Sequence, residues 1–461
     1  MILKTHRWHM YIMTVVGWLW LSMSTFAATI HVPADQPTIQ SGIDAAEDGD
    51  TVLVSDGIYT GEGNVNISFS GKEITVKSRN GAEATIIDCE ETLNTRGFVF
   101  ESKESRASVL DGFTIKNGVH DLGGGIYCHT ASPTIQNCVI TQNRATATRF
   151  FGQGGGGIYG KDTTVHIIDC IISQNQSASG LGGGALIDGE GVWTFNNPQS
   201  VIFDNCTVSE NIGSGIVCFD LSPSIIKDCT VLQNSGRGIV CTFFARGTSI
   251  TNCRIEQNTG GGIECSETSS VQVQDCIIKQ NRAEYGGGIY CSPTGDAEIS
   301  GCIIAQNTAT ETGGGIDIIS TRGLVTITNC TITQNTAHDR GGGIATFIEF
   351  SQFTLTDSII WDNHSHSKHH EVSPGGRRII IKSCDIQEGF AGMDREPDGE
   401  WFIYENNIDA DPRFINPDTG DYRLEPHSPA ALMGAQPPLG GVTAVTHKEK
   451  RLVTWGELKM Q

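Results

Sequence analysis

A seven-residue motif recurs nine times between Asn137 and Asn363. Asn, Asp or Gly precedes a Cys, Ile or Val follows two places after it, and Asn stands five places after it. The Cys position holds Cys138, Cys170, Cys206, Cys229, Cys253, Cys276, Cys302 and Cys330, with Ser358 in the ninth copy. Copies lie 23 to 36 residues apart. A constant motif with variable spacers predicts a stacked solenoid whose loops differ in length.

The motif has the composition of a bent β-strand. Cys229 and Val231 are two residues apart and face the same way in a strand, whereas Ile226 breaks that alternation. A sharp bend at Asp228 would let all three point inward, and Asn, Asp and Gly tolerate the left-handed backbone angles of such a bend. No two successive copies carry an acid at this position, as expected for residues stacked in a ladder. No apolar stripe of helical period extends through a repeat.

A second element, Gly-x-Gly followed by Ile or Ala, lies between the copies, as in Gly123-Gly124-Gly125-Ile126-Tyr127-Cys128. Ile126 and Cys128 are expected to point inward, so the residue between them should point outward. The glycines lack a Gly-Lys-Ser/Thr sequence, so they are interpreted as turns into the next strand and not as a phosphate loop.

These repeats resemble the right-handed parallel β-helix superfamily with the pectin-lyase-like fold. The stretch from His31 to Val52 resembles the cap that opens many secreted bacterial members, and the stretch from Asp409 to Pro429 resembles their closing segment. The glycine elements also resemble chlamydial polymorphic membrane protein repeats, although no long C-terminal β-barrel region follows them. The resemblance implies an all-β fold, a single-stranded right-handed parallel β-helix solenoid. We expect roughly 12 coils and a short N-terminal cap helix near residues 38–46.

The sequence predicts three regions. Residues 1–27 have a basic start and a short apolar run, from Met10 to Leu21, which predicts a signal peptide; an uncleaved anchor is the alternative. Residues 28–434 form the β-helix, with caps at 28–60 and 385–434, and the aromatic segment from Trp401 to Tyr404 is expected to close the last coil. Residues 435–461 form a C-terminal tail. No transmembrane segment is expected after signal cleavage, and the localisation is secreted, extracellular or cell-surface.

The fifteen cysteines predict buried free thiols and not a disulfide framework. Most fall in two columns, and neighbouring coils place their side chains in parallel, about 4.8 Å apart. A disulfide needs its Cβ atoms roughly 3.5–4.5 Å apart. No Cys-x-x-Cys sequence occurs, so zinc has little support.

The net charge of −21 opposes nucleic-acid binding, because phosphate recognition needs a basic face. An acidic surface favours solubility and is compatible with calcium, so the expected cofactor is none, with Ca²⁺ possible. The expected partner is a polysaccharide or a surface protein, and the chain is expected to be a monomer.

The outward column of the glycine-started strands gives the catalytic hypothesis. It reads Tyr127, Tyr159, Leu186, Val217, Val240, Glu264, Tyr290, Asp317 and Ala345. Glu264 and Asp317 lie two coils apart, about 9.6 Å between backbones, and flank Tyr290. That spacing approaches the roughly 6.5–9.5 Å between the carboxyl groups of an inverting glycosidase. The alternative interpretation is an ordinary exposed sheet face. The column has no Arg or Lys to act as a lyase base.

Two further sets of residues are binding candidates. Tyr127, Tyr159 and Trp193 are ligand-binding candidates, because aromatic side chains on a face or in a long loop can stack on sugar rings. His364, His366, His369 and His370, followed by Glu371, are candidates for a transition metal, against the expectation of no specific metal.

Two functions remain open at this stage. The favoured one is a non-catalytic secreted or cell-surface β-helix protein that binds carbohydrate or an envelope or surface partner. The alternative is a polysaccharide lyase or glycoside hydrolase that acts on the face started by the glycines. One fold hosts many functions, so the fold does not choose between them.

Overall fold

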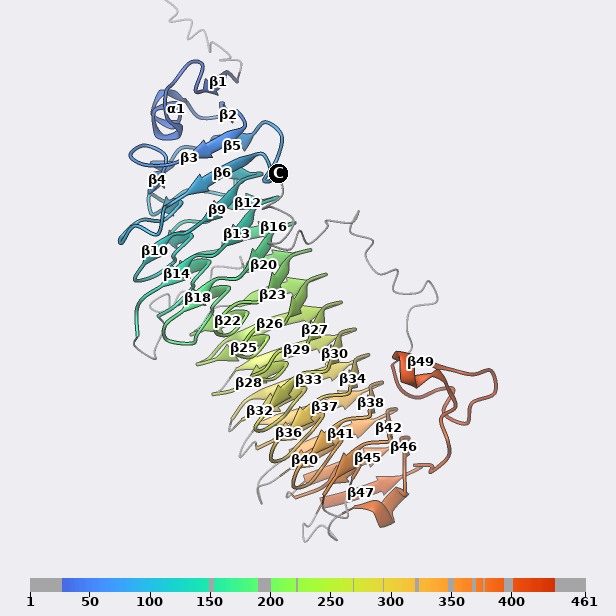
Figure 1. The fold of residues 1–461 in the computed structure, drawn as a ribbon. Helices are drawn as coiled ribbons and strands as arrows, with labels where there is room; N and C mark the ends of the chain where they lie inside the picture. Colours follow the sequence, from blue (N-terminus) through green and yellow to red (C-terminus); the bar gives the residue numbers. More distant parts are fainter. Residues whose placement is uncertain are drawn as a thin grey trace, which may run out of the picture.

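The structure is a computed structural model that describes residues 27–148, 153–189, 200–220, 223–267, 269–292, 294–319, 323–346, 352–366, 370–375, 378–393 and 401–435. The chain forms a rod of stacked coils (Figure 1). Three long parallel sheets run along the rod, with 15, 13 and 12 strands, and the core lies between them. The predicted all-β solenoid of about 12 turns is confirmed.

One coil contributes one strand to each long sheet. In a central coil these are β23 (Ser224–Lys227) in the 15-stranded sheet, β24 (Thr230–Leu232) in the 13-stranded sheet and β25 (Ile239–Thr242) in the 12-stranded sheet. The 15-stranded sheet runs from β1 (Thr29–Val32) to β47 (Trp401–Glu405), and the 13-stranded sheet from β3 (Gly57–Tyr59) to β46 (Asp385–Ile386).

The 12-stranded sheet is the one that starts at the glycines. Its strands are β4 (Ile67–Ser68), β7 (Phe98–Phe100), β11 (Ile126–His129), β15 (Ile158–Lys161), β19 (Ala185–Asp188), β22 (Ile216–Phe219), β25, β28 (Ile263–Cys265), β32 (Ile289–Cys291), β36 (Ile316–Ile318), β40 (Ile344–Thr346) and β44 (Val372–Ser373).

The predicted bend before each Cys is present. Asp228 has a φ of 55°, and the side chains of Ile226, Cys229 and Val231 are all buried. Positive φ angles of 51–63° occur at all nine equivalent positions, namely Asn137, Asp169, Asn205, Asp228, Asn252, Asp275, Gly301, Asn329 and Asp357. These residues also form a ladder, for example where the side-chain amide of Asn252 donates to the carboxylate of Asp228 at 2.5 Å.

The asparagines five places after each Cys form a buried hydrogen-bond ladder. Both the backbone N–H and the side-chain amide of Asn258 donate to Oδ1 of Asn281, at 3.0 and 2.9 Å. The same amide donates to the carbonyl of Val231 at 3.1 Å. The pattern runs from Asn143 to Asn363, and every member is at most 1% exposed. Each coil is therefore tied to the next by three hydrogen bonds that water cannot reach.

A second left-handed column was not predicted from the sequence. The residue before each ladder asparagine also has a positive φ, between 54° and 59°. It is Gln142, Gln174, Glu210, Gln233, Gln257, Gln280, Gln306, Gln334 or Asp362. Glutamine is not a typical left-handed residue, and its amides here bond from coil to coil on the surface, as from Gln257 to Gln280 at 3.1 Å.

All fifteen cysteines are buried and free. Cys138 to Cys330 line one column, and the sulfur of Cys229 accepts the backbone N–H of Cys206 at 3.4 Å. The prediction of reduced, buried thiols that pack as small apolar side chains is confirmed.

A short helix covers the first coil, as predicted. Helix α1 (Ile39–Ala45) begins after Thr38, whose side-chain oxygen accepts the backbone N–H of Ser41 at 3.2 Å. Ile39 and Ile43 are fully buried against the core. A side chain at Gly42 would lie 2.9 Å from Val32 and Val52, so only glycine lets the helix pack this closely on the sheet.

The aromatic segment near residue 401 provides the last strand, β47, and Phe390 packs against Phe402 and Tyr404. The chain then turns back along the side of the rod and does not continue over its end (Figure 1). We call residues 409–435 the closing segment; it contains β48 (Phe414–Asn416) and β49 (Asp421–Leu424). Tyr422 donates to Gln334 at 2.9 Å, and Ala435 donates to the Thr331 hydroxyl at 3.1 Å.

Several predictions fall on residues that the structure does not describe. They include the signal peptide apart from Ala27, and the tail beyond Ala435. In the described ranges, no helix is long and apolar enough to cross a membrane.

We predict that Asn258→Ala lowers the free energy of unfolding by about 3 kcal/mol, because it leaves buried groups on both neighbouring coils without partners. Urea unfolding followed by circular dichroism measures the loss. Gln257→Ala is the matched control, since it removes the adjacent amide from the exposed ladder, and it should cost less than about 0.5 kcal/mol. Equal losses in the two variants would contradict the assignment of the buried ladder as the main tie between coils.

Candidate functional site

The outward column of the 12-stranded sheet is in the predicted register. Adjacent strands pair Tyr127 with Tyr159, then continue through Leu186, Val217, Val240, Glu264, Tyr290 and Asp317 to Ala345. The sequence therefore located every member of this column correctly.

The prediction that this column is exposed to solvent is wrong over most of its length. Tyr159 is 2% exposed, and Leu186 and Val217 are fully buried. They form a second hydrophobic cluster with Phe219 and with side chains such as Leu181, which come from the turns that precede the strands. The column lies on the outside of the coil, as predicted, but the turns cover it, and the sequence did not indicate that cover. This apolar half of the column, from Tyr159 to Val217, is therefore part of a hydrophobic cluster and does not face solvent.

Tyr127, at the end of this apolar half, is half-buried and already in contact on both faces. The Arg96 guanidinium lies 4.7 Å from its ring centroid, and the Tyr159 ring stacks 5.8 Å away. Tyr127 and Tyr159 thus pack on each other and on Arg96, and neither presents a free ring face.

The other half of the column is polar, and it receives an arginine from a neighbouring turn. Arg237 Nε lies 2.8 Å from Oε2 of Glu264. The same guanidinium lies 4.9 Å from the ring centroid of Tyr290, at cation–π distance. Gly261 makes room for it, because a Cβ there would lie 2.5 Å from Arg237 Nη1. Arg237, Glu264 and Tyr290 therefore form one cluster across three coils.

Arg237 was not predicted as a site residue, although the sequence contains a signal for it. Arg237 stands in Gly236-Arg237-Gly238, where most other copies have three glycines in a row. The statement that the column has no Arg or Lys considered only the residues within the column. Arg237 lies on the turn before β25 and reaches the column from the side.

Asp317 is enclosed, not exposed as predicted. Its side chain is fully buried, the Thr312 hydroxyl donates to Oδ2 at 2.5 Å, and Oδ1 has no hydrogen-bond partner within the described ranges. Burial raises the pKa of Asp317 to about 6, against the lowering effects of the Thr312 hydrogen bond and of Arg340 and Arg237. The catalytic hypothesis needs both carboxylates open to substrate, whereas Glu264 is ion-paired with Arg237 and Asp317 is covered.

A groove opens beside this cluster. It has a volume of about 500 Å³ and is lined by Arg237, Arg282, Glu284, Tyr285 and Tyr290, together with small residues of the turns. Tyr285 is 36% exposed, and Nη1 of Arg237 has no hydrogen-bond partner in the part of the chain that the structure describes. Two tyrosine rings and two guanidinium groups can stack on a sugar ring and donate to its oxygens.

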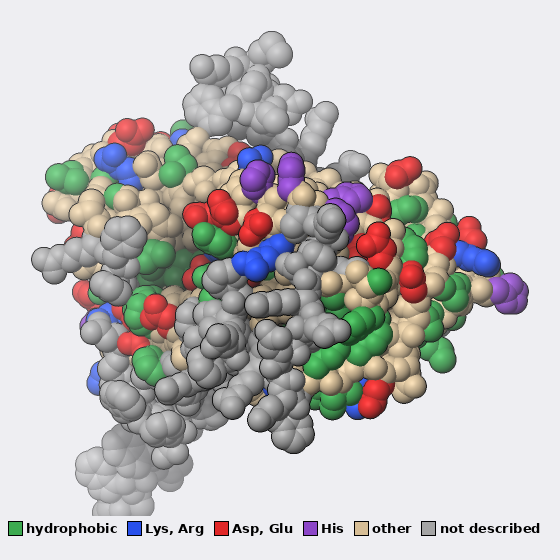
Figure 2. Space-filling model, turned by 90° about the horizontal axis from the view of Figure 1, so that it is seen from below, with side chains coloured by type: hydrophobic (Ala, Val, Ile, Leu, Met, Phe, Trp, Pro, Cys, Tyr) green, Lys and Arg blue, Asp and Glu red, His purple; other side chains and the backbone are tan. Residues whose placement is uncertain are grey.

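The histidines near residue 366 contact one another in pairs. Figure 2 shows a group of histidine side chains beside acidic ones on the face seen there. His338 and His366 stack with centroids 4.8 Å apart, and His370 Nδ1 accepts the backbone N–H of Ser365 at 2.9 Å. Among the described residues, no three His, Cys, Asp or Glu side chains are arranged to hold a metal ion. His369 and Trp193 lie outside these residues, so those two predictions stay open.

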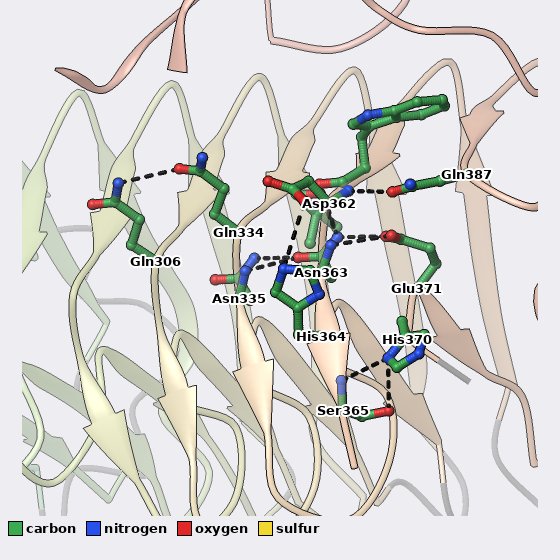
Figure 3. A network of polar contacts seen from close by, with 12 residues as sticks. Gln306, Gln334, Asn335, Asp362, Asn363, His364, Ser365, His370, Glu371 and Gln387 are labelled. Carbon is green, nitrogen blue, oxygen red and sulfur yellow. Dashed lines mark hydrogen bonds and ion pairs between the residues drawn. The ribbon is translucent and has the colours of Figure 1, made fainter. Parts of the chain in front are cut away.

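Glu371, at the end of the histidine segment, closes the asparagine ladder (Figure 3). The backbone N–H and the side-chain amide of Asn363 donate to its two carboxylate oxygens at 3.0 and 2.6 Å. Gly389 stands where the next ladder asparagine would be, five places after Cys384. Glu371 is 3% exposed, and burial raises its pKa to about 8, although both hydrogen bonds oppose that shift.

The comparisons with known proteins define the family. A model described as "Right handed beta helix region" matches residues 76–243, 149–332 and 284–409, which together span more than half of the chain. The chain belongs to this right-handed β-helix family. No curated protein matches the chain.

Two similar solved structures are a complex of XylC with xylose and the A-module of the mannuronan C-5 epimerase AlgE4 from Azotobacter vinelandii. The first is 11% identical with a TM-score of 0.44, covering 84% of this chain and 87% of that chain. The second is 11% identical with a TM-score of 0.30, covering 79% and 94%. Likeness at this level says nothing about ligand or reaction, so the site is interpreted from its own residues.

We predict that Glu371→Gln flattens the dependence of stability on pH. A folded-state pKa of about 8, above the ordinary 4.5, means that the proton on Glu371 contributes stability fully below pH 4.5. This contribution is lost as pH rises from about 4.5 to about 8. The free energy of unfolding of the wild type should therefore fall across this interval, and that of the variant should fall less.

Urea unfolding at a series of pH values measures both slopes. Asp317→Asn is the control. Because the pKa of Asp317 is raised only to about 6, the stability that its proton contributes is lost below the pH range in which Glu371 titrates. Identical slopes above pH 6 for the wild type and Glu371→Gln would contradict the assignment.

Proposed function

We propose that this chain is a secreted or cell-surface β-helix protein that binds carbohydrate, without cleaving it, in the groove beside Tyr290. The observation that carries the proposal is the groove itself, where the exposed ring of Tyr285 and the half-buried ring of Tyr290 lie beside Arg237 and Arg282. Exposed aromatic faces next to fixed hydrogen-bond donors are the usual means of recognising sugars in water.

A binding role fits the state of the two candidate catalytic carboxylates. Glu264 is held by Arg237 at 2.8 Å and by the Ser266 hydroxyl at 3.0 Å. These contacts fix the position of the Glu264 carboxylate and orient Arg237 over Tyr290. Asp317 has no exposed surface. Neither side chain is available to protonate a glycosidic oxygen or activate a water molecule.

The second candidate function, a polysaccharide lyase or glycoside hydrolase, rests on one observation. The unpartnered Oδ1 of Asp317 and its pKa of about 6 are properties of a general acid. Catalysis would require the groove to open at Tyr290 and admit substrate to this oxygen.

The surface charge and the arrangement of the groove favour particular partners. With a net charge of −21 the rod repels nucleic acid, so the expected partner is a polysaccharide or a surface protein that carries one. The groove is contained in one chain, which is compatible with a monomer. We propose no required cofactor. Calcium would act only as a bridge to an acidic ligand, since no three His, Cys, Asp or Glu side chains of the described ranges are arranged to hold a metal ion.

We predict that Tyr285→Ala and Tyr290→Ala each weaken binding of a retained polysaccharide about tenfold, which corresponds to about 1.4 kcal/mol for one lost stacking contact. A panel of neutral and acidic polysaccharides is first screened by affinity electrophoresis, and the dissociation constant of each bound one is then measured by calorimetry. Leu324→Ala, 48% exposed on the 15-stranded sheet, is the control and should leave binding unchanged.

The same panel separates binding from catalysis. Reducing ends and unsaturated products are measured after prolonged incubation with the wild type and with Asp317→Asn. Binding without products supports the proposal. Product formation that is lost in Asp317→Asn would replace it with the enzymatic function, and the absence of binding to every polysaccharide would refute both.

A further inference from the structure

A second cleft lies on another side of the rod, between the 13-stranded sheet and the closing segment. Its volume is about 520 Å³. The sheet contributes Trp361 and Asp362, and the closing segment contributes Asp411, Arg413, Phe414 and Glu425. The closing segment is fixed on either side of this space, by Tyr422 on Gln334 and by Gly434, whose N–H donates to the carbonyl of Asp357 at 2.8 Å.

Trp361 departs from the repeat. It is the third residue after the Cys position, on β42 (Ile359–Trp361), and points outward from the sheet. The same position elsewhere holds Thr141, Ser173, Ser209, Leu232, Glu256, Lys279, Ala305 and Thr333. Trp361 is only partly buried and lines the cleft with Phe414 from the closing segment. The cleft thus has apolar aromatic walls, which pack favourably against an aliphatic stem or another ring.

The rim of the cleft is acidic. Asp362, Asp411 and Glu425 give three negative charges against one positive charge from Arg413. The side chain of Asp362 is 48% exposed, and its ion-pair partner is His364 at 3.5 Å, which is charged only when protonated. Aromatic walls below an acidic rim fit the side chains of Lys and Arg, whose stems are apolar and whose ends are cationic.

The chain itself supplies such side chains in the sequence that follows the closing segment. Residues 436–461 contain Lys448, Lys450, Arg451 and Lys459 against Glu449 and Glu457, a net charge of +2. The rest of the chain then carries −23, because the total is −21. The basic tail and the acidic rod are therefore of opposite charge, and the cleft is one place where the rod concentrates carboxylates.

The point where the tail begins is close to the cleft. Ala435 is hydrogen-bonded to Thr331, on β38 (Thr331–Thr333), which pairs with β42 in the sheet. Thr331 and Ile359 are 1% exposed, so the closing segment is already packed on this face up to its last described residue. Lys448 lies 13 residues beyond Ala435, a reach of up to about 43 Å when extended, against about 5 Å between neighbouring strands. The tail is therefore long enough for Lys448 to reach the cleft.

We propose that the cleft around Trp361 is a docking site for the basic stretch Lys448–Arg451 of the same chain. Docking extends the contact that the closing segment already makes with the 13-stranded sheet, and it places cationic side chains against Trp361 and the carboxylates of Asp362, Asp411 and Glu425. This proposal is independent of the carbohydrate groove, which lies on the 12-stranded sheet.

The test is the rate at which trypsin cuts the full-length chain after Lys448, Lys450 and Arg451, followed by mass spectrometry. Docking shields these bonds, so Trp361→Ala and the double variant Asp362→Asn/Glu425→Gln should be cut at least fivefold faster than the wild type. Salt at roughly 0.5 M should accelerate the wild type to the same rate, because the charged contacts are screened. The double variant Gln272→Ala/Glu298→Gln, on the exposed face of the 15-stranded sheet, is the control and should match the wild type.

Carbodiimide cross-linking identifies the occupant independently of proteolysis. The proposal expects links from Lys448 or Lys450 to Asp362, Asp411 or Glu425 within one chain, and their loss when the three basic residues are changed to Glu. Links only to carboxylates elsewhere, or equal cutting rates in the wild type and the cleft variants at low salt, would overturn it. Links between ¹⁵N-labelled and unlabelled copies would also overturn it, because they would show that a second copy occupies the cleft.

Discussion

The rod depends on the buried asparagine ladder. Each ladder asparagine receives two hydrogen bonds from the coil before it and gives two to the coil after it, in a region that water does not reach. Buried amides that are fully satisfied fix the register between coils, since a slip of one residue would leave several polar groups without partners. The left-handed bends on either side of the motif make this geometry possible. The ladder needs a partner at its end, and Glu371 supplies the final acceptor where Gly389 cannot.

Both candidate sites lie where the repeat is interrupted. In the 12-stranded sheet the outward column changes from apolar packing at Leu186 and Val217 to polar contacts at Glu264 and Tyr290. The change coincides with the substitution of Arg237 for a glycine of the turn. On the 13-stranded sheet, Trp361 places an aromatic ring at a position that is not aromatic in the other copies, where the closing segment folds back. Each cleft is therefore lined by a side chain that departs from the repeat at its position.

Much of the fold could be predicted from the sequence because ladders repeat. The bends at the Asn and Asp positions, the buried cysteines and the register of the outward column all follow from spacing and from period-two alternation. The return of the closing segment along the rod could not be predicted, because it depends on single contacts such as that of Tyr422 with Gln334. For the same reason the enclosure of Asp317 and the reach of Arg237 were missed. Both come from turns, whose paths the repeat does not specify.

We propose that ligand recognition belongs to the polar half of the outward column. Hydrogen–deuterium exchange of the full-length protein, with and without a saturating polysaccharide ligand, can test this proposal. We expect protection at residues 237–242, 263–267 and 282–291, with the apolar half of the column at 158–161 and 185–188 unchanged. Protection confined to the 15-stranded sheet or to the apolar half, with none around Tyr290, would contradict it.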